Sequence, residues 1–275
     1  IQAVGISDTS NLCGALEFSE NLSKVGTQPI VGTQIVINFK NQFGLIPLIA
    51  KNEIGYKKII ELSSKSYLEN ESLTEPHCNF DDLLEKPEGI IIFSGHINGL
   101  IGKLFNNGKF SEVEEIYSIL KKNYKDNFYI EIQRHGDWNE KSFELYNLKL
   151  SKKLEIPIIA SNEVYYLDKS MHEAHDALMC IGTKTYLNDK NRTKLSNQHY
   201  LKSSEEMRTL FSDLPESLEN NYNLSVRCSF KPETSKPILP NISSEKDGNA
   251  NETLTNESLK GLKDKFLNVF KIENK

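Results

Sequence analysis

The feature that most constrains the fold is an alternation of apolar, strand-like runs with amphipathic, helix-like segments between residues 1 and 160. The strand-like runs are 1–7, 29–37, 43–50, 90–93, 128–133 and 156–160. Helical spacing of apolar residues lies between them, at 11–25, 54–67, 100–105, 110–125 and 140–153. Strands that alternate with helices build mostly parallel sheets. This order therefore predicts an α/β domain with a parallel sheet or barrel, in which 43–50 runs antiparallel to 29–37 across a short turn.

The pattern changes after residue 166. Helical spacing continues at 170–181, 203–211 and 215–228, and the polar segments between them are typical of turns. Residues 231–250 are rich in Pro, Ser, Asn and Gly and are expected to be a surface linker, and 254–270 regains helical spacing. We therefore predict an α/β domain over 1–166, a helical extension over 167–230, and a linker with the start of a further region over 231–275.

Composition excludes some functions. The net charge of -5 argues against this chain supplying the main electrostatic contact with nucleic acid. The 4 cysteines are scattered without metal-binding spacing, which favours reduced thiols over a disulfide framework. Because no apolar run approaches the roughly 18 residues of a membrane span, we expect no membrane partner.

Polar residues that can bind metals follow the predicted strands. In β/α barrels the site residues gather at the C-terminal ends of the strands. The ends in this chain carry Asp8, Gln34, His96, His135 and Glu163. Imidazole and carboxylate groups suit Zn, Mn or Fe, and such metals activate water for attack on phosphorus. A metal-dependent phosphoesterase needs several imidazoles and carboxylates of this kind to converge on one mouth of its barrel.

Several motifs resemble the PHP (polymerase and histidinol phosphatase) domain as it occurs in bacterial C-family replicative polymerases, the DNA polymerase III alpha subunits. The segment Asp8-Thr9-Ser10-Asn11-Leu12-Cys13-Gly14 is similar to the second motif of that family. Further similar segments are 28–32, Ser94-Gly95-His96, 131–136 and 159–166. The pair 175–181 and 200–207 resembles the segment that follows the barrel in the polymerases, and a histidinol phosphatase is not expected to carry it.

The resemblance implies a fold. It is a PHP-type distorted β/α barrel over about 1–166, followed by a helical extension that leads toward the polymerase palm. The chain opens on a strand, with Ile1 in place of Met. We therefore expect the first strand of the barrel, with the family's His-x-His motif, to lie upstream of Ile1.

Departures from the family pattern suggest a vestigial site formed by Asp8, Gln34, His96, His135, Glu163 and Tyr165. Where the family commonly has His, Glu and His, this chain has Thr9, Gln34 and Tyr165. An amide is a poor ligand for a transition metal, and a phenol must first lose its proton. Asp8, His96, His135 and Glu163 remain weak candidates for metal ligands, with simpler alternatives for two of them: Asp8 as an acid at a helix N-terminus, and His96 as a hydrogen-bonded loop residue.

The resemblance also implies a function. The parent protein would be the catalytic subunit of a cytoplasmic, DNA-templated DNA polymerase that uses Mg and deoxynucleoside triphosphates. It would bind DNA, a proofreading exonuclease subunit, a sliding clamp and other replisome subunits. The segment itself would be a non-catalytic scaffold, without a confidently expected cofactor. The alternative is an active metal-dependent phosphoesterase, either a 3′-5′ exonuclease or a histidinol-phosphatase-like enzyme, and the number of retained ligands distinguishes the two.

Overall fold

The computed structural model describes residues 2–70, 75–237 and 249–269. They fall into two compact units, Ile1–Glu233 and Thr234–Lys275. The expected strand at residue 1 and the end of the last expected helix at residue 270 lie partly outside the described residues. The division of the chain at residues 166 and 230 into family domains stays a prediction.

The first unit is built on a mixed sheet of 7 strands, of which six follow the order β1-β2-β3-β5-β6-β7 and the seventh, β4, pairs with β2. The strands are β1 (Ala3–Thr9), β2 (Gln28–Phe39), β3 (Gln42–Ala50), β4 (Cys78–Asn79), β5 (Ile90–Phe93), β6 (Phe128–Ile132) and β7 (Ile158–Ala160). β3 runs antiparallel to both of its neighbours, and the other pairs are parallel. The sheet is open, with β1 and β7 at its ends. This confirms the predicted α/β fold with a distorted barrel sheet, and the strand expected upstream of Ile1 stays a prediction.

Helices follow the strands as the periodicity predicts. The first unit contains α1 (Ala15–Lys24), α2 (Glu53–Leu68), α3 (Phe80–Leu84), α4 (Leu100–Asn106), α5 (Phe110–Tyr124), α6 (Glu140–Leu154), α7 (His172–Thr183), α8 (Ser204–Leu210) and α9 (Pro215–Arg227). The strand β4 and the helix α3 were not predicted from the sequence. A capping box marks the start of α3, because Asn79 is the N-cap and the Asp82 carboxylate accepts a hydrogen bond from the Asn79 N–H at 2.7 Å.

Apolar side chains fill both faces of the sheet. Along β5, Ile90 and Ile92 belong to the larger core, whereas Ile91 and Phe93 belong to a smaller core on the opposite face. This alternation follows from the two-residue period of a strand. Leu224 of α9 packs in the smaller core. The helical extension therefore covers part of the barrel sheet.

Two asparagine side chains of α9 donate hydrogen bonds to β7, the strand at one end of the sheet. The Asn220 side chain donates to the Ile158 carbonyl at 2.8 Å, and the Asn221 side chain donates to the Ala160 carbonyl at 2.7 Å. An exposed strand edge offers unpaired backbone groups to other chains. These two side chains satisfy such groups and fasten α9 to β7.

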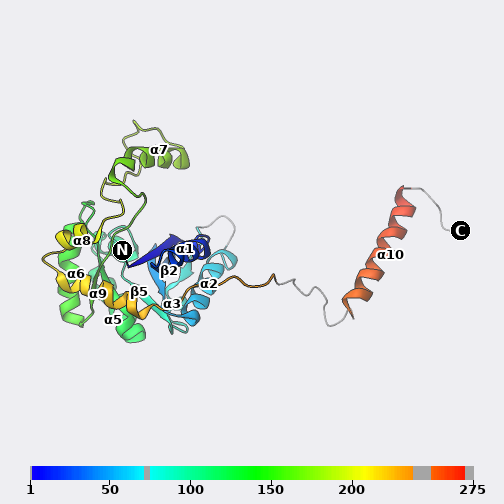
Figure 1. Ribbon diagram of the computed structural model, residues 1–275, viewed down its shortest axis with the longest axis horizontal. Coiled ribbons are helices and arrows are strands. Elements are labelled where there is room, and N and C mark those ends of the chain that lie inside the picture. The colour runs from blue at the N-terminus through cyan, green and yellow to red at the C-terminus, as the bar shows by residue number, and fades with distance from the viewer. Residues whose placement is uncertain (1, 71–74, 238–248, 270–275) are drawn as a thin grey trace. The chain divides into compact units, whose positions relative to one another are not determined.

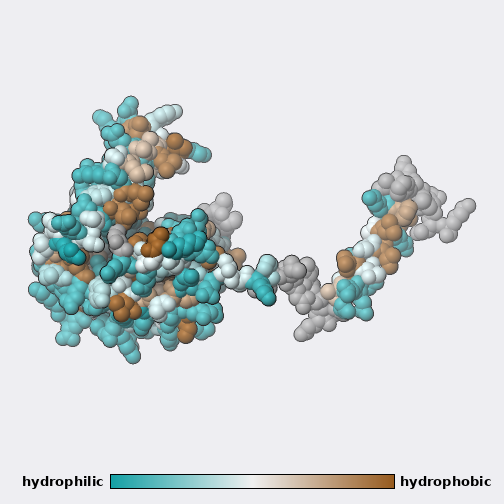
Figure 2. All heavy atoms as spheres, in the orientation of Figure 1, coloured by the Kyte–Doolittle hydropathy of each residue, from teal (hydrophilic) through white to brown (hydrophobic). Residues whose placement is uncertain are grey.

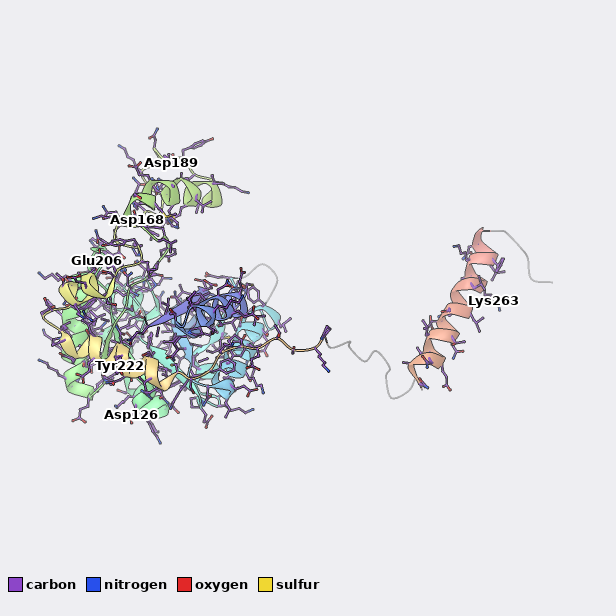
Figure 3. The ribbon with its side chains drawn as sticks, in the orientation of Figure 1. Asp126, Asp168, Asp189, Glu206, Tyr222 and Lys263 are labelled. Atoms are coloured by element: carbon purple, nitrogen blue, oxygen red, sulfur yellow. The ribbon has the colours of Figure 1, made fainter. Side chains whose placement is uncertain are left out.

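Residues between β7 and α8 form an arm that carries α7 (Figure 1). Figure 3 places Asp168 between α7 and the body of the unit, and Asp189 beside α7. At the base of the arm, the backbones of Tyr166 and Tyr200 form an isolated parallel β-bridge. The Leu201 N–H donates to the Tyr166 carbonyl at 3.0 Å. Hydrophobic residues show on the arm in Figure 2, and Leu178 and Ile181 are 63% and 75% exposed.

The described part of the second unit contains helix α10 (Ala250–Val269), which confirms the expected helix and extends it at its start. Four of its large apolar side chains are exposed, namely Leu254, Leu259, Leu262 and Phe266. Among the described residues, no helix combines the length and the apolar character needed to cross a bilayer.

Candidate functional site

Five strands of the main sheet order run in the same direction, as does the short β4, and they bring their ends to one edge of the sheet. The parallel and antiparallel pairings give β1, β2, β5, β6 and β7 one common direction. His96 and His135 follow β5 and β6, and Glu163 and Tyr165 follow β7. Gln34 lies within the longer β2, opposite Thr9 at the end of β1. The topology therefore places the expected site residues at, or next to, strand ends on one edge.

Asp8 and Gln34 are held mainly through backbone contacts. The Thr33 hydroxyl donates to the Asp8 carbonyl at 2.7 Å, and the Gln34 amide donates to the Ser7 carbonyl at 3.4 Å. The interpretation of Asp8 as a helix N-terminal acid is wrong, because Asp8 lies inside β1 and α1 begins only at Ala15. An Asx turn at Asn11 intervenes, in which the Asn11 side chain accepts from the Cys13 N–H at 3.0 Å.

His135 is buried and tightly held. Its ring stacks on the ring of His199, with centroids 4.1 Å apart and an angle of 8° between the planes. Its backbone N–H donates to the Glu140 carboxylate at 2.9 Å, and its carbonyl accepts from the Ser196 hydroxyl at 2.7 Å. Burial, followed by the charges of His199 and Lys202, lowers the pKa of His135 to about 3. The imidazole is therefore neutral near pH 7.

The neighbouring asparagine fixes which ring nitrogen of His135 carries the proton. The Asn162 side chain donates to the Tyr200 carbonyl at 2.8 Å, so its oxygen faces the other way. That oxygen accepts from Lys202 Nζ at 3.0 Å and lies 3.2 Å from His135 Nε2. Because the oxygen can only accept, Nε2 is the donor and holds the proton. The nitrogen with the free lone pair is Nδ1, which lies 3.7 Å from the Glu140 carboxylate.

Glu163 and Tyr165 bond to each other. The Tyr165 hydroxyl donates to Glu163 Oε1 at 2.9 Å. Burial, followed by the Glu163 charge, raises the pKa of Tyr165 well above its ordinary value. The Tyr165 ring also contacts the rings of His175 and His199, with centroids 5.5 Å and 5.6 Å away. Tyr165 is therefore a protonated phenol that packs between the body and the arm.

Glu131 of β6 is a buried acid that lines the same small pocket as His96. Glu131 is 6% exposed, and its Oε1 accepts from Gln133 Nε2 at 3.0 Å and from the Ser161 hydroxyl. Burial raises the pKa of Glu131, and the bonds from Ser161 and Gln133 act against that rise. Glu131 and His96 line a small pocket together with residues of α6.

These groups do not suit a transition-metal ion. His135 Nε2 is protonated and bonds to Asn162, and its free Nδ1 lone pair lies 3.7 Å from the Glu140 carboxylate. Tyr165 keeps its phenolic proton, and Gln34 is a neutral amide. Within the part of the chain that the structure describes, no group of three or more His, Cys, Asp and Glu residues is arranged to hold a metal. Chemically, the arrangement supports packing and hydrogen bonding, and we derive no metal-dependent step from it.

Three residues of this cluster were missed by sequence reasoning: His199, Lys202 and Asn162. The segment 200–207 is one of those that resemble the polymerases, and this was the available signal. His172 and His175, which are spaced so that both could bind one metal, make other contacts. His172 Nε2 lies 3.0 Å from the Leu195 carbonyl, and the His175 ring packs on Tyr165 and Tyr166.

Arg134 connects the site to the helical extension. Its guanidinium donates to Glu144 of α6 at 2.6 Å, to Asp213 at 2.7 Å and to the Leu210 carbonyl at 2.6 Å. It also lies over the Phe211 ring, 4.8 Å from the centroid. These bonds hold the pKa of Asp213 below its usual range. The residue before His135 therefore ties the end of β6 to α6 and to the turn between α8 and α9.

Comparison with known proteins gives a consistent family. The PHP domain family matches residues 1–135. DNA polymerase III alpha subunits are similar over nearly the whole chain: that of Rickettsia bellii is 38% identical over 99% of this chain and 23% of its own length. That of Caulobacter vibrioides is 34% identical over 95% of this chain and 24% of its own length, and that of Borreliella burgdorferi is 35% identical over 97% and 24%. The chain thus spans about a quarter of these relatives.

One solved structure, of a candidate metal-dependent phosphoesterase from Bifidobacterium adolescentis, has a TM-score of 0.29 at 13% identity, covering 59% of this chain and 77% of its own. That likeness is too low to carry an argument. The assignment rests instead on the sequence matches together with the order of the strand-end motifs. Residues 1–135 match the PHP domain family, within a chain that is similar along almost its whole length to DNA polymerase III alpha subunits.

Proposed function

We propose that this chain is part of the catalytic alpha subunit of a bacterial replicative DNA polymerase III, and that its PHP domain is a non-catalytic scaffold. Similarity to such subunits over 99% of the chain carries the first part of the proposal. The parent protein would extend DNA from deoxynucleoside triphosphates with Mg, in the cytoplasm. Its partners would include a proofreading exonuclease subunit and a sliding clamp.

The contacts that the strand-end residues make support the scaffold role. His135 stacks on His199 and bonds to Asn162, and Tyr165 bonds to Glu163. A hydrolytic metal site needs free lone pairs that converge on the ion and an open position for water. Here His135 Nε2 and the Tyr165 hydroxyl both hold protons, and the free lone pair of His135, on Nδ1, lies beside the Glu140 carboxylate. We infer that these residues join the barrel to the arm.

The test is an assay for phosphoesterase and 3′-5′ exonuclease activity of the purified chain with added Mn, Zn or Mg. We expect no release of nucleotide or phosphate above background, and the same result for a His135→Ala variant. Metal-dependent release that His135→Ala abolishes would contradict the scaffold role and favour the alternative, an active phosphoesterase. Primer extension by the full-length parent protein tests the polymerase assignment separately.

A further inference from the structure

The small pocket between β6, α6 and the loop after β5 collects three polar atoms without a hydrogen-bond partner. These atoms are Asn147 Nδ2, Glu131 Oε2 and His96 Nε2, and all three residues line the pocket. Asn147 is fully buried and Glu131 is 6% exposed. Because an unsatisfied buried polar group destabilises the fold, three such groups around one cavity point to a shared ligand.

The roles of Asn147 and Glu131 follow from the bonds that they already make. The Tyr117 hydroxyl donates to Asn147 Oδ1 at 2.8 Å, which identifies the oxygen and leaves Nδ2 as a pure donor. Glu131 Oε1 accepts from the Gln133 amide and the Ser161 hydroxyl, so Oε2 is the carboxyl oxygen without a partner. Glu131 lines the pocket, where Oε2 can accept a hydrogen bond.

His96 contributes a second donor. Its Nδ1 accepts from the Asn98 N–H at 3.2 Å, so this nitrogen carries the lone pair. In a neutral imidazole the other nitrogen then carries the proton. The pocket is thus surrounded by two N–H donors and one carboxylate acceptor.

The two donors and the one acceptor determine which kind of ligand fits the pocket. A cation would meet the N–H groups of Asn147 and His96, and an anion would meet the Glu131 carboxylate. A neutral molecule that accepts twice and donates at least once satisfies all three. The cavity volume of about 10 Å³ leaves room for about one water molecule. We propose that the pocket is a binding site for a single buried water, held by Asn147, His96 and Glu131.

Such a water would link three separate elements through the site. It would connect the loop after β5, strand β6 and helix α6, in addition to the direct contact between Tyr117 and Asn147. Buried waters typically make about three hydrogen bonds and are costly to remove. The inference goes beyond the proposed function and does not depend on the polymerase assignment.

The first test is a high-resolution crystal structure of the protein, together with a second data set from crystals soaked in Mn²⁺. We expect one water at about 2.8–3.0 Å from each of the three atoms, and no anomalous signal in the pocket after soaking. A dry pocket, or an anomalous peak from manganese between His96 and Glu131, would overturn the proposal.

The second test is ¹⁵N NMR of the histidine rings, which reports the tautomer of His96 directly. We expect a neutral ring with the proton on Nε2, slowly exchanging with solvent. In Asn147→Leu, which removes one donor, we expect the water and this slow exchange to be lost. Asn123→Leu, a matched helical substitution outside the pocket, should leave both unchanged. A His96 ring with its proton on Nδ1 in the unsubstituted protein would overturn the proposal, even if Asn147→Leu fails to fold.

Discussion

The two ends of the sheet differ in how they are covered. At the β7 end, side chains of α9 donate hydrogen bonds to the carbonyls of Ile158 and Ala160. At the β1 end, none of the residues of the strand is buried. The site residues follow the same division. His135 and Tyr165 make side-chain contacts with the arm, and Asp8 and Gln34 are tied mainly through backbone groups. The comparison teaches that the strand-end residues have a packing role at one end of the sheet and little role at the other.

The largest effect that tests this contrast is expected for Arg134→Ala. The substitution removes the partner of Glu144, whose side chain is 14% exposed, and also the bonds to Asp213 and Leu210. We expect the free energy of unfolding to fall by about 3 kcal/mol, because a largely buried carboxylate is left unpaired. Chemical denaturation measures it. As a control, Lys40→Ala breaks an exposed ion pair with Glu115 and should cost less than about 1 kcal/mol. Equal losses of unfolding free energy in the two variants would contradict a structural role of Arg134 at the β7 end.

Acidification should weaken the β7 end through His135 and His199. Burial lowers the pKa of both rings in the folded state, that of His135 to about 3 from 6.5. Between these values the unfolded chain binds protons that the folded chain does not, so stability falls as the pH drops below 6.5. The slope is at most about 1.4 kcal/mol per pH unit for each ring.

Comparison of His135→Gln with the unsubstituted protein isolates this slope in denaturation curves at several pH values. The comparison is needed because burial raises the pKa of Glu131 and Glu140, which stabilises the folded state in acid and opposes the histidine effect. We expect the variant to lose less stability than the unsubstituted protein between pH 6.5 and about 3. Parallel curves would mean that His135 is charged in the folded state.

A smaller loss is expected when the covering of β7 is removed. Asn221→Ala deletes the hydrogen bond to the Ala160 carbonyl, and the unfolding free energy should fall by about 1 kcal/mol. Hydrogen exchange of the amides in α9 should increase at the same time. Asn123→Ala, which removes a local helical contact to the Ile119 carbonyl, is the control for the substitution itself. If both variants behave alike, α9 does not protect the β7 edge.

The smallest effect is expected at the opposite end. Asp8 is exposed and is held through its carbonyl, which Asp8→Asn preserves. The change in unfolding free energy should stay within about 0.5 kcal/mol, with or without added Mn or Zn. A thermal shift that needs both the metal and the Asp8 carboxylate would show that this end of the site binds metal.

Periodicity was sufficient to predict most of the fold. The apolar runs at 90–93 and 29–37 correctly predicted strands, and the observed helix ends differ from the predicted ones by only a few residues. The two-residue strand β4 was missed because Cys78–Asn79 is too short to show a period. The turn after β1 was misread because the side-chain bond of Asn11, rather than the charge of Asp8, shapes the approach to α1.

The site was predictable only as a set of strand ends. Its members are ordered along the chain, so the barrel pattern is enough to bring them to one edge. The ring partner of His135 comes from the arm, after α7, and no spacing along the chain predicts that His199 stacks on it. The protonation of Tyr165 likewise depends on burial and on Glu163 together, which become visible only in three dimensions.

Metal binding by the purified chain tests the central claim most directly. Equilibrium dialysis against Zn²⁺ and Mn²⁺ near pH 7, followed by elemental analysis, gives the number of ions held per chain. The account predicts clearly less than one ion per chain, with no difference between the unsubstituted protein and His135→Ala. Binding of one or more ions per chain that is lost in His135→Ala would contradict it, because the strand ends would then form a metal centre.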